Sequence, residues 1–332
     1  MNGTSPGSQL DPSLLQLLVE PYGLAAADLR WIRSSQNCVY EHAGDPPAIV
    51  RISHGRGRTL EQVEAEIAWV AELAAQGLPV CQAILSPAGR MCERVIHNGQ
   101  EFLVVRFQRA PGRKVELADS DAAVYRQLGQ LTGRLHEASF ARVSDVSTRY
   151  HRPRWFDSRL LTADLERYAA GQPAFQKWVY GLIAQLAGQT RDALGLVHAD
   201  IHFGNLFLHD GQLWIFDFDN CEYGSVEQDL ATMLYDAIYC RVLNRVPPAE
   251  VNTHVRSRWQ SFLGGYRTVR RDHAFDEELL RKFLVLREAI IYLHYHRVLD
   301  LNSVSRAFLA GLDQMRRNVE QETTEIELAE TS

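Results

Sequence analysis

The chain has 332 residues, of which 46% are hydrophobic and 23% charged, so it has the composition of a globular protein with room for about two domains. Its formal net charge of −6 argues against nucleic-acid binding, which requires a dense basic surface. The five scattered cysteines, the lack of a signal-peptide pattern and the lack of a membrane-length apolar run favour a cytoplasmic protein that does not enter a membrane.

The first third of the chain is predicted to be rich in strands. Asp11 and Pro12 are typical of a helix start, and the leucine-rich helix that they begin ends before Gly23. A longer helix with apolar residues at helical spacing runs from Thr59 to a stop at Gly77. The expected strands are 37–42, 48–53, 81–87, 91–98 and 101–107, the last two joined by an Asn-Gly hairpin turn.

The rest of the chain is predicted to be mainly helical. One hairpin interrupts this pattern, with strands over 205–208 and 212–216 around an Asp-Gly turn. We therefore expect an α+β chain of two lobes. Its parts are a β-rich lobe with one long helix over 1–107, a linker over 108–118, a mostly helical lobe over 119–320 and an acidic, flexible tail over 321–332.

The hairpin carries an unusual number of polar residues. The stretch "VHADIHFGNLFLHDGQLWIFDFDN" places Asp200 before the first strand, Asn205 at its start and Asp217 at the end of the second. Isolated carboxylates are costly to bury unless they are paired, hydrogen-bonded or bound to metal. Two carboxylates and an amide at one end of a rigid hairpin predict a Mg²⁺ site, because Mg²⁺ prefers oxygen ligands. A carboxylate that does not bind the metal could orient a hydroxyl nucleophile or accept its proton.

This pattern resembles a known family. His198-Ala-Asp200-x-x-x-x-Asn205, followed by Asp217, is similar to the kinase pattern H-x-D-x-x-x-x-N with a downstream metal aspartate. The segments "HADIHFGN", "IFDFDN" and "QDLA" are similar to the aminoglycoside phosphotransferase and choline kinase family, which includes homoserine-kinase-like and stress-response-kinase-like members. The resemblance implies a bilobal protein-kinase-like fold and an ATP- and Mg²⁺-dependent phosphotransferase.

The resemblance also implies roles for the residues of the motif. It makes Asp200 the catalytic aspartate, Asn205 and Asp217 the Mg²⁺ ligands, and His198 a brace of the loop. His202 matches the second histidine of the motif. Asp229 in "QDLA" matches an aspartate that steadies the catalytic loop. Two further acidic residues, Asp219 and Glu222, either assist the metal or the substrate or lie on a solvated loop.

The resemblance implies an ATP site in the amino-terminal lobe. Arg51 stands where the family has a lysine for the α- and β-phosphates, and Glu66 is at the spacing of its partner glutamate. Arginine can bind phosphate in a bidentate manner, but it does not replace lysine atom for atom. Other expected nucleotide contacts are the hydroxyls of a glycine-free loop, Ser34 and Ser35, and the adenine-binding backbone of Arg106, Phe107 and Gln108.

Several alternatives stay open on the residues alone. The polar residues of the hairpin could be a buried network that braces a turn. His198 and His202 are four residues apart, as in zinc pairs, although no third ligand or H-E-x-x-H helix accompanies them. The acceptor is expected to be a hydroxyl of a small, amine-bearing metabolite or antibiotic, because acidic residues surround the motif. The alternatives are a bacterial Ser/Thr protein kinase of the same fold and a nucleotide-binding pseudokinase.

Overall fold

The computed structural model describes residues 9–34, 36–140, 150–191, 193–271 and 275–326. By internal packing the chain forms two compact units. The first holds the described residues of Met1–Arg113, Thr148–Arg152 and Phe207–Asp219. The second holds those of Lys114–Ser147, Pro153–Leu206 and Asn220–Ser332. Most of the hairpin thus groups with the first unit, whereas the sequence pattern placed it in the helical lobe.

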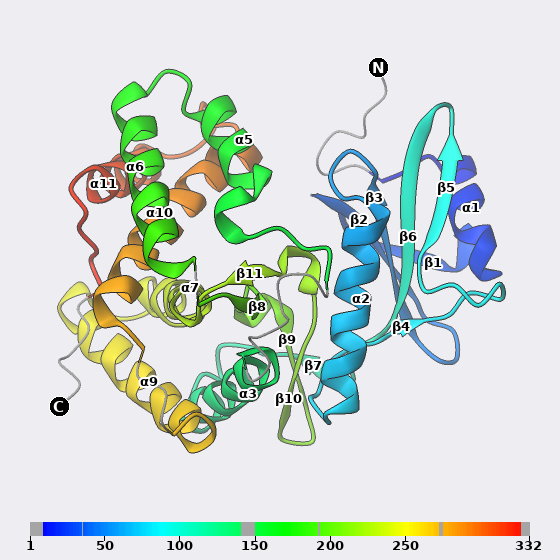
Figure 1. The fold of residues 1–332 in the computed structure, drawn as a ribbon, viewed down its shortest axis with the longest axis horizontal. Coiled ribbons are helices and arrows are strands. Elements are labelled where there is room, and N and C mark those ends of the chain that lie inside the picture. The colour runs from blue at the N-terminus through cyan, green and yellow to red at the C-terminus, as the bar shows by residue number, and fades with distance from the viewer. Residues whose placement is uncertain (1–8, 35, 141–149, 192, 272–274, 327–332) are drawn as a thin grey trace. The chain divides into compact units, whose positions relative to one another are not determined.

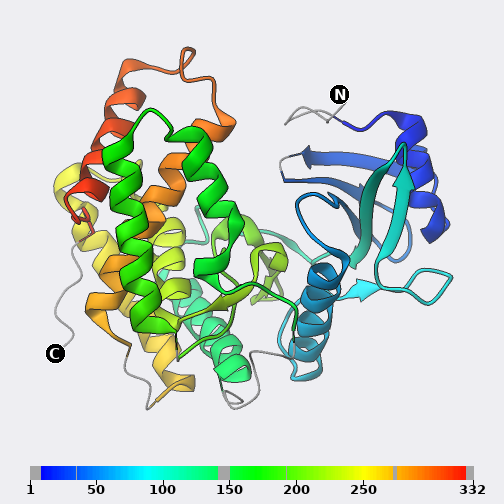
Figure 2. The same ribbon diagram turned by 45° about the horizontal axis from the view of Figure 1, so that its top comes forward.

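The first unit is built on an antiparallel sheet with the strand order β1-β2-β3-β6-β4, in which β5 also pairs with β6. Helices α1 and α2 lie on opposite sides of this sheet (Figures 1 and 2). Its elements are α1 (Pro12–Val19), β1 (Leu29–Ser34), β2 (Asn37–His42), β3 (Ala48–His54), α2 (Leu60–Ala75), β4 (Ala83–Ile84), β5 (Glu93–His97) and β6 (Gln100–Gln108).

Side-chain alternation along the strands decides which residues meet which helix. Val50 and Ile52 of β3 pack in the core that α1 completes. Leu103 and Val105 of β6 pack in a second core with residues of α2. Because Arg51 lies between Val50 and Ile52, its side chain points to the α2 side of the sheet. The pleat of β3 therefore brings an arginine to the helix that carries Glu66.

The hairpin forms a small sheet with the strand order β10-β9-β7. Its strands are β7 (Arg113–Lys114), β9 (Leu206–His209) and β10 (Gln212–Ile215). The turn residues Asp210 and Gly211 have φ values of 48° and 78°, as expected for an Asp-Gly hairpin turn. The backbone N–H of Ile215 donates to the carbonyl of Pro79 at 3.0 Å, which ties the hairpin to the segment after α2.

The second unit is mostly helical and contains one short two-stranded sheet, β8 with β11. Its described helices include a π-helical turn over Leu234–Tyr239, between α7 and α8. The elements are α3 (Ala122–Phe140), α5 (Arg159–Tyr168), α6 (Pro173–Thr190), β8 (Gly195–Val197), β11 (Glu222–Gly224), α7 (Val226–Met233), α8 (Cys240–Leu243), α9 (Pro248–Val269), α10 (Glu277–Val298) and α11 (Arg306–Glu320).

Helices α3 and α9 pack with unusually close backbones because glycines lie at their contact. A Cβ atom on Gly129 of α3 would lie 2.0 Å from the carbonyl oxygen of Phe262. A Cβ atom on Gly265 of α9 would lie 1.8 Å from the carbonyl oxygen of Arg126. Any larger residue at either position would push the helices apart. This contact holds His136 of α3 against Tyr266 of α9, at 2.9 Å from Nδ1 to the hydroxyl.

The mixed α+β class predicted from the sequence is confirmed. The helix starts also follow their local signals, since the Asp11 carboxylate caps α1 and Thr59 with Gln62 forms a capping box on α2. Strand β1 was not predicted, and neither were the two- and three-residue strands β7, β8 and β11. Within the described ranges, no helix combines the length and apolarity needed to cross a membrane.

Candidate active site

Arg51 and Glu66 form a buried ion pair in the first unit. The Nη1 and Nη2 groups of Arg51 donate to the two carboxylate oxygens of Glu66 at 2.8 and 2.7 Å. The side chains are 5% and 1% exposed. The guanidinium also lies 5.0 Å from the centroid of the Phe107 ring. Its Nε is a buried donor that has no hydrogen-bond partner among the described residues.

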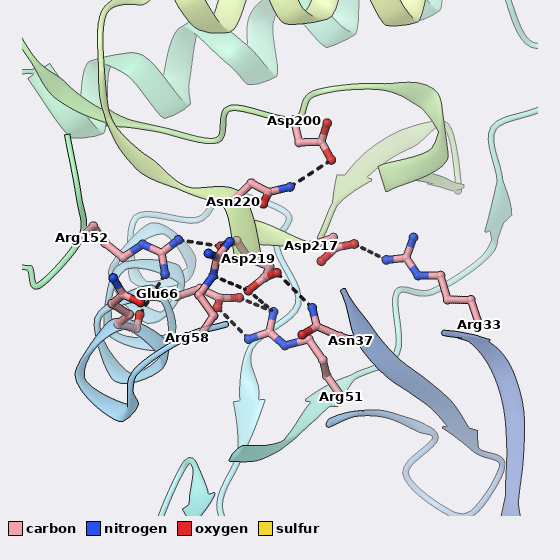
Figure 3. Close-up of polar contacts among 11 residues, drawn as sticks. Arg33, Asn37, Arg51, Arg58, Glu66, Arg152, Asp200, Asp217, Asp219 and Asn220 are labelled. Carbon is pink, nitrogen blue, oxygen red and sulfur yellow. Dashed lines mark hydrogen bonds and ion pairs between the residues drawn. The ribbon is translucent and has the colours of Figure 1, made fainter. Parts of the chain in front are cut away.

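Asp219 lies at the centre of a cluster of arginines (Figure 3). Its carboxylate accepts from Asn37 Nδ2 at 3.0 Å and from Arg58 Nε at 3.2 Å, and Arg51 Nη1 is 4.0 Å away. Its carbonyl oxygen accepts from Arg58 at 3.0 Å and from Arg152 at 2.5 Å. Burial raises the pKa of Asp219, but Arg51, Arg58 and Arg152 lower it more, so that it lies well below its usual value. This carboxylate is therefore ionised, and it is already paired with arginine side chains of the protein.

Asp217, two residues before Asp219, has a strained backbone conformation. Its φ of 67° lies in the left-handed region, which few residues other than glycine adopt, although aspartate tolerates it better than most. The next residue, Phe218, is buried and packs edge-on against Trp69 of α2, with ring centroids 5.3 Å apart. The Asp217 carboxylate forms an ion pair with the half-exposed Arg33 at the end of β1. The anchored Phe218 thus fixes the direction in which Asp217 points.

In the second unit, Asp200 has partners on both carboxylate oxygens. Its Oδ1 accepts from Arg287 Nη2 at 3.1 Å. Its Oδ2 lies 3.5 Å from Asn220 Nδ2 (Figure 3) and 3.6 Å from His202 Nε2. Burial raises the pKa of Asp200, but His202 and Arg287 lower it more, so that it lies well below its usual value. The carboxylate is therefore ionised at neutral pH and oriented by three residues.

The backbone before Asp200 is held by Asp229 of α7. The Asp229 carboxylate accepts from the backbone N–H groups of His198 at 3.2 Å and Ala199 at 2.8 Å, and His136 Nε2 lies 3.2 Å away. Ala199 has a φ of 62°, a conformation that costs an L-residue about 1–2 kcal/mol. The two hydrogen bonds to the buried Asp229 offset this cost and hold the backbone before Asp200.

The other motif residues of the second unit are also fixed by local hydrogen bonds. Asn205 is 2% exposed and its Nδ2 donates to the carbonyl of Asp200 at 3.1 Å. Its Oδ1 is therefore the atom that could bind a cation. His202 caps the turn that contains Asn205, because its Nδ1 accepts from the Gly204 N–H at 2.9 Å. His198 is fully buried.

The residues expected near adenine lie in regular strand structure. Arg106, Phe107 and Gln108 are the last three residues of β6, and the N–H of Gln108 donates to the carbonyl of Gln82 at 2.8 Å. That N–H is thus already used within the sheet. Ser34 ends β1, and its hydroxyl lies 3.3 Å from the Cys38 sulfur. Ser35 lies outside the described residues.

The sequence interpretation missed the residues that surround the motif. Arg33 contacts Asp217, Arg58 and Arg152 contact Asp219, and Arg287 contacts Asp200. These arginines lie 67 to 184 positions from their partners, so no local spacing indicates them.

Glu222, whose role was left open, accepts from Gln228 at 2.8 Å. In the part of the chain that the structure describes, no three His, Cys, Asp or Glu side chains form a metal cluster.

Comparisons with known proteins identify the family of the chain. Residues 32–270 match the phosphotransferase enzyme family, APH. The amicoumacin kinase of Bacillus subtilis is 29% identical over 311 residues, which cover 91% of this chain and 90% of that protein. The serine/threonine protein kinase RdoA of Salmonella typhimurium is 26% identical over 231 residues, 67% of each chain.

A solved structure gives the same result for the fold. The amicoumacin kinase hAmiN, in complex with AMP-PNP, Ca²⁺ and Ami, has a TM-score of 0.81 at 28% identity, and the match covers 96% of this chain and 95% of that one. The family match extends over most of the chain and includes every motif residue from His198 to Asp229. The chain therefore belongs to the phosphotransferase enzyme family, and it is an ATP-dependent phosphotransferase with a protein-kinase-like fold.

Proposed function

We propose that this protein transfers the γ-phosphate of Mg²⁺-bound ATP to a hydroxyl group of a small, amine-bearing molecule. Asp200 orients the acceptor hydroxyl and receives its proton as the phosphoryl group leaves ATP. Arg51, braced by Glu66, binds ATP phosphates. The orientation of an ionised Asp200 by Arg287, Asn220 and His202 is the observation that carries the proposal.

The donor atoms fit a hard divalent cation. Asn205 offers an amide oxygen whose partner nitrogen is already bound, and Asp217 offers a carboxylate on an anchored backbone. Such a cation would neutralise phosphate charge, and we propose these two residues as its protein ligands. Asp219 was expected to assist the metal or the substrate or to lie on a solvated loop, but three guanidinium groups already surround it and would repel a cation. We propose instead that Asp219 holds Arg51 and Arg58 in place.

The contact between Arg33 and Asp217 predicts an effect on metal dependence. Arg33→Ala should lower the Mg²⁺ concentration needed for half-maximal ATP binding, because the arginine and the cation compete for one carboxylate. An exposed ion pair contributes at most about 1 kcal/mol, so the expected shift is at most about fivefold. Titration of ATP binding against Mg²⁺ measures it. Arg30→Ala is the control, since Arg30 lies on the same strand and pairs with Glu41. Weaker ATP binding in Arg33→Ala would instead mean that Arg33 contacts phosphate.

The charges around Asp200 give the amine preference little support. Asp200 and Asp236 face Arg287, and His202 lies 3.6 Å from Asp200, so cationic side chains already offset these two carboxylates. A net negative field, which would favour a cationic acceptor, does not follow from this group. The acidic residues on which the sequence argument relied add little, because Asp219 and Glu222 have partners of their own. One relative of this chain is named amicoumacin kinase, so amicoumacin is the first acceptor to test.

A panel of acceptors tests the proposal directly. ADP release and mass spectrometry should be followed with ATP and Mg²⁺, using amicoumacin, aminoglycosides, amino alcohols, homoserine, neutral sugars and a protein mixture. We expect turnover with an amine-bearing small molecule. Turnover with the protein mixture alone would favour the alternative function, a Ser/Thr protein kinase, which is what the relative RdoA is named. ATP binding without turnover of any acceptor would identify a pseudokinase.

A further inference from the structure

Arg287 lies against two carboxylates in the second unit. It is in the middle of α10, and its side chain is 11% exposed. One nitrogen, Nη2, donates to Asp200 Oδ1 at 3.1 Å and also contacts Asp236 Oδ2. Among the described residues its Nε has no hydrogen-bond partner. Arg287 therefore bridges the proposed catalytic aspartate and a second, deeper aspartate.

The surrounding elements explain why an arginine is present at this position. The residues one turn before Arg287 on the same face of α10, Phe283 and Leu284, are buried, so the helix places the arginine beside the apolar core. A buried guanidinium is tolerated only when carboxylates compensate its charge. Asp236 supplies one of them from a π-helical turn, an irregularity that is frequent at functional sites. Asp200 supplies the other.

Arg287 has a different effect on Asp200 from the other two partners. Asn220 and His202 both lie on the Oδ2 side, at 3.5 and 3.6 Å. Arg287 is on Oδ1 at 3.1 Å, which is the shortest of the three contacts. Without Arg287, the carboxylate would be held from one side only and could rotate. Efficient transfer requires the reacting groups to be aligned, and a misplacement of 1 Å can cost about 10²-fold in rate.

We propose that Arg287 is a positioning residue that holds the Asp200 carboxylate in the orientation needed for the acceptor hydroxyl, and that Asp236 holds Arg287. The inference rests on the proposed catalytic role of Asp200. In the proposed arrangement, Arg287 itself contacts neither ATP nor the acceptor. Its loss should therefore reduce kcat and leave the KM for ATP nearly unchanged.

Steady-state kinetics on single variants test the proposal. ADP release would be measured with amicoumacin, or with water as the acceptor if amicoumacin is not phosphorylated. Arg287→Ala should reduce kcat by about 10²-fold, and added guanidinium ion should restore part of it. Arg287→Lys should lose less, because an ammonium can still contact both carboxylates. Asp236→Asn should also lose less, since its amide oxygen can accept from Arg287. Arg297→Ala is the control, because Arg297 lies on the same helix and pairs with Asp164 at 2.8 Å.

The outcomes separate this inference from the proposed function. Full kcat in both Arg287→Ala and Arg287→Lys, with Asp200→Asn inactive, would overturn the positioning role alone. Full activity of Asp200→Asn would overturn the catalytic assignment itself. If Arg287→Ala does not fold, Arg287→Lys and Asp236→Asn decide the question: an unchanged kcat in both refutes the proposal. Rescue by guanidinium would support it, because a purely structural loss would not respond to the ion.

Discussion

Replacing Asp200 with asparagine is expected to remove most phosphoryl transfer while ATP and Mg²⁺ bind almost as before. A positioned general base contributes about 10²- to 10⁴-fold to a rate. Asparagine keeps the shape and can still accept from Arg287, so the fold of the loop should survive. Its amide cannot take the proton of the acceptor hydroxyl, and one of the two negative charges that balance Arg287 is lost.

Asp217→Asn is the matched comparison for this result. Because Asp217 is proposed to bind the cation, its replacement should weaken the binding of ATP in the presence of Mg²⁺ and have much less effect without Mg²⁺. Nucleotide affinity with and without Mg²⁺, and turnover of a confirmed acceptor, should be measured for both variants and the unmodified protein. If Asp200→Asn turns over at the normal rate, the assignment of Asp200 is wrong. If both variants lose only nucleotide affinity, the division of roles is wrong.

Sequence signals were sufficient where the physical cause is local. The Asn98-Gly99 turn, with φ values of 49° and 70°, follows from residues that tolerate positive φ. The Asp-Gly hairpin and the caps of α1 and α2 depend on neighbours within a few positions in the same way. The register of Asp200 and Asn205 is also local, since both lie in the short segment between β8 and β9 and Asn205 donates to the carbonyl of Asp200. The motif could therefore be found without a structure.

The long-range contacts had no such signal. Strand β1 carries a mixture of half-buried and exposed residues at the edge of the sheet, so its alternation is weak. Strands β8 and β11 are three residues long and exist only because they pair with each other across the chain. Arg287 and Asp200 are 87 positions apart. Whether an arginine is a solvated helix charge or the partner of a catalytic carboxylate depends on tertiary packing, which spacing alone does not encode.

The pair of Arg51 and Glu66 shows how far the sequence argument reached. The spacing indicated Glu66 as the partner of Arg51, and the structure contains the bidentate pair. The family that the chain resembles has a lysine where this chain has Arg51. An arginine presents two nitrogens to one carboxylate and still has Nε available, so it can bind Glu66 with both Nη groups and keep a donor for another ligand. If Arg51 binds phosphate as proposed, the contact would therefore use a different atom from the ammonium nitrogen of a lysine.

The second large effect is expected from Glu66→Ala. This change leaves the Arg51 guanidinium buried, with Asp219 at 4.0 Å as its nearest remaining carboxylate. Breaking a buried pair by removing one partner typically destabilises a protein by about 3–5 kcal/mol. Both side chains are almost fully buried here, so solvent does not weaken the interaction. The free energy of unfolding of the first unit should therefore fall by about 3 kcal/mol or more, and ATP affinity should fall because Arg51 loses its brace.

Urea unfolding and ATP titration on a small set of variants check this prediction. Glu64→Ala is the control, because Glu64 is an exposed residue of the same helix.

The double variant Arg51→Met with Glu66→Leu removes both charges and fills the space with apolar atoms. Replacing a buried ion pair in this way is often neutral or stabilising, so the double variant should unfold near the unmodified protein while it binds ATP poorly. That separation would show that the pair is kept for binding phosphate and not for stability. A stable Glu66→Ala with unchanged ATP affinity would show that Asp219 alone compensates Arg51, and the brace assigned to Glu66 would then be unnecessary.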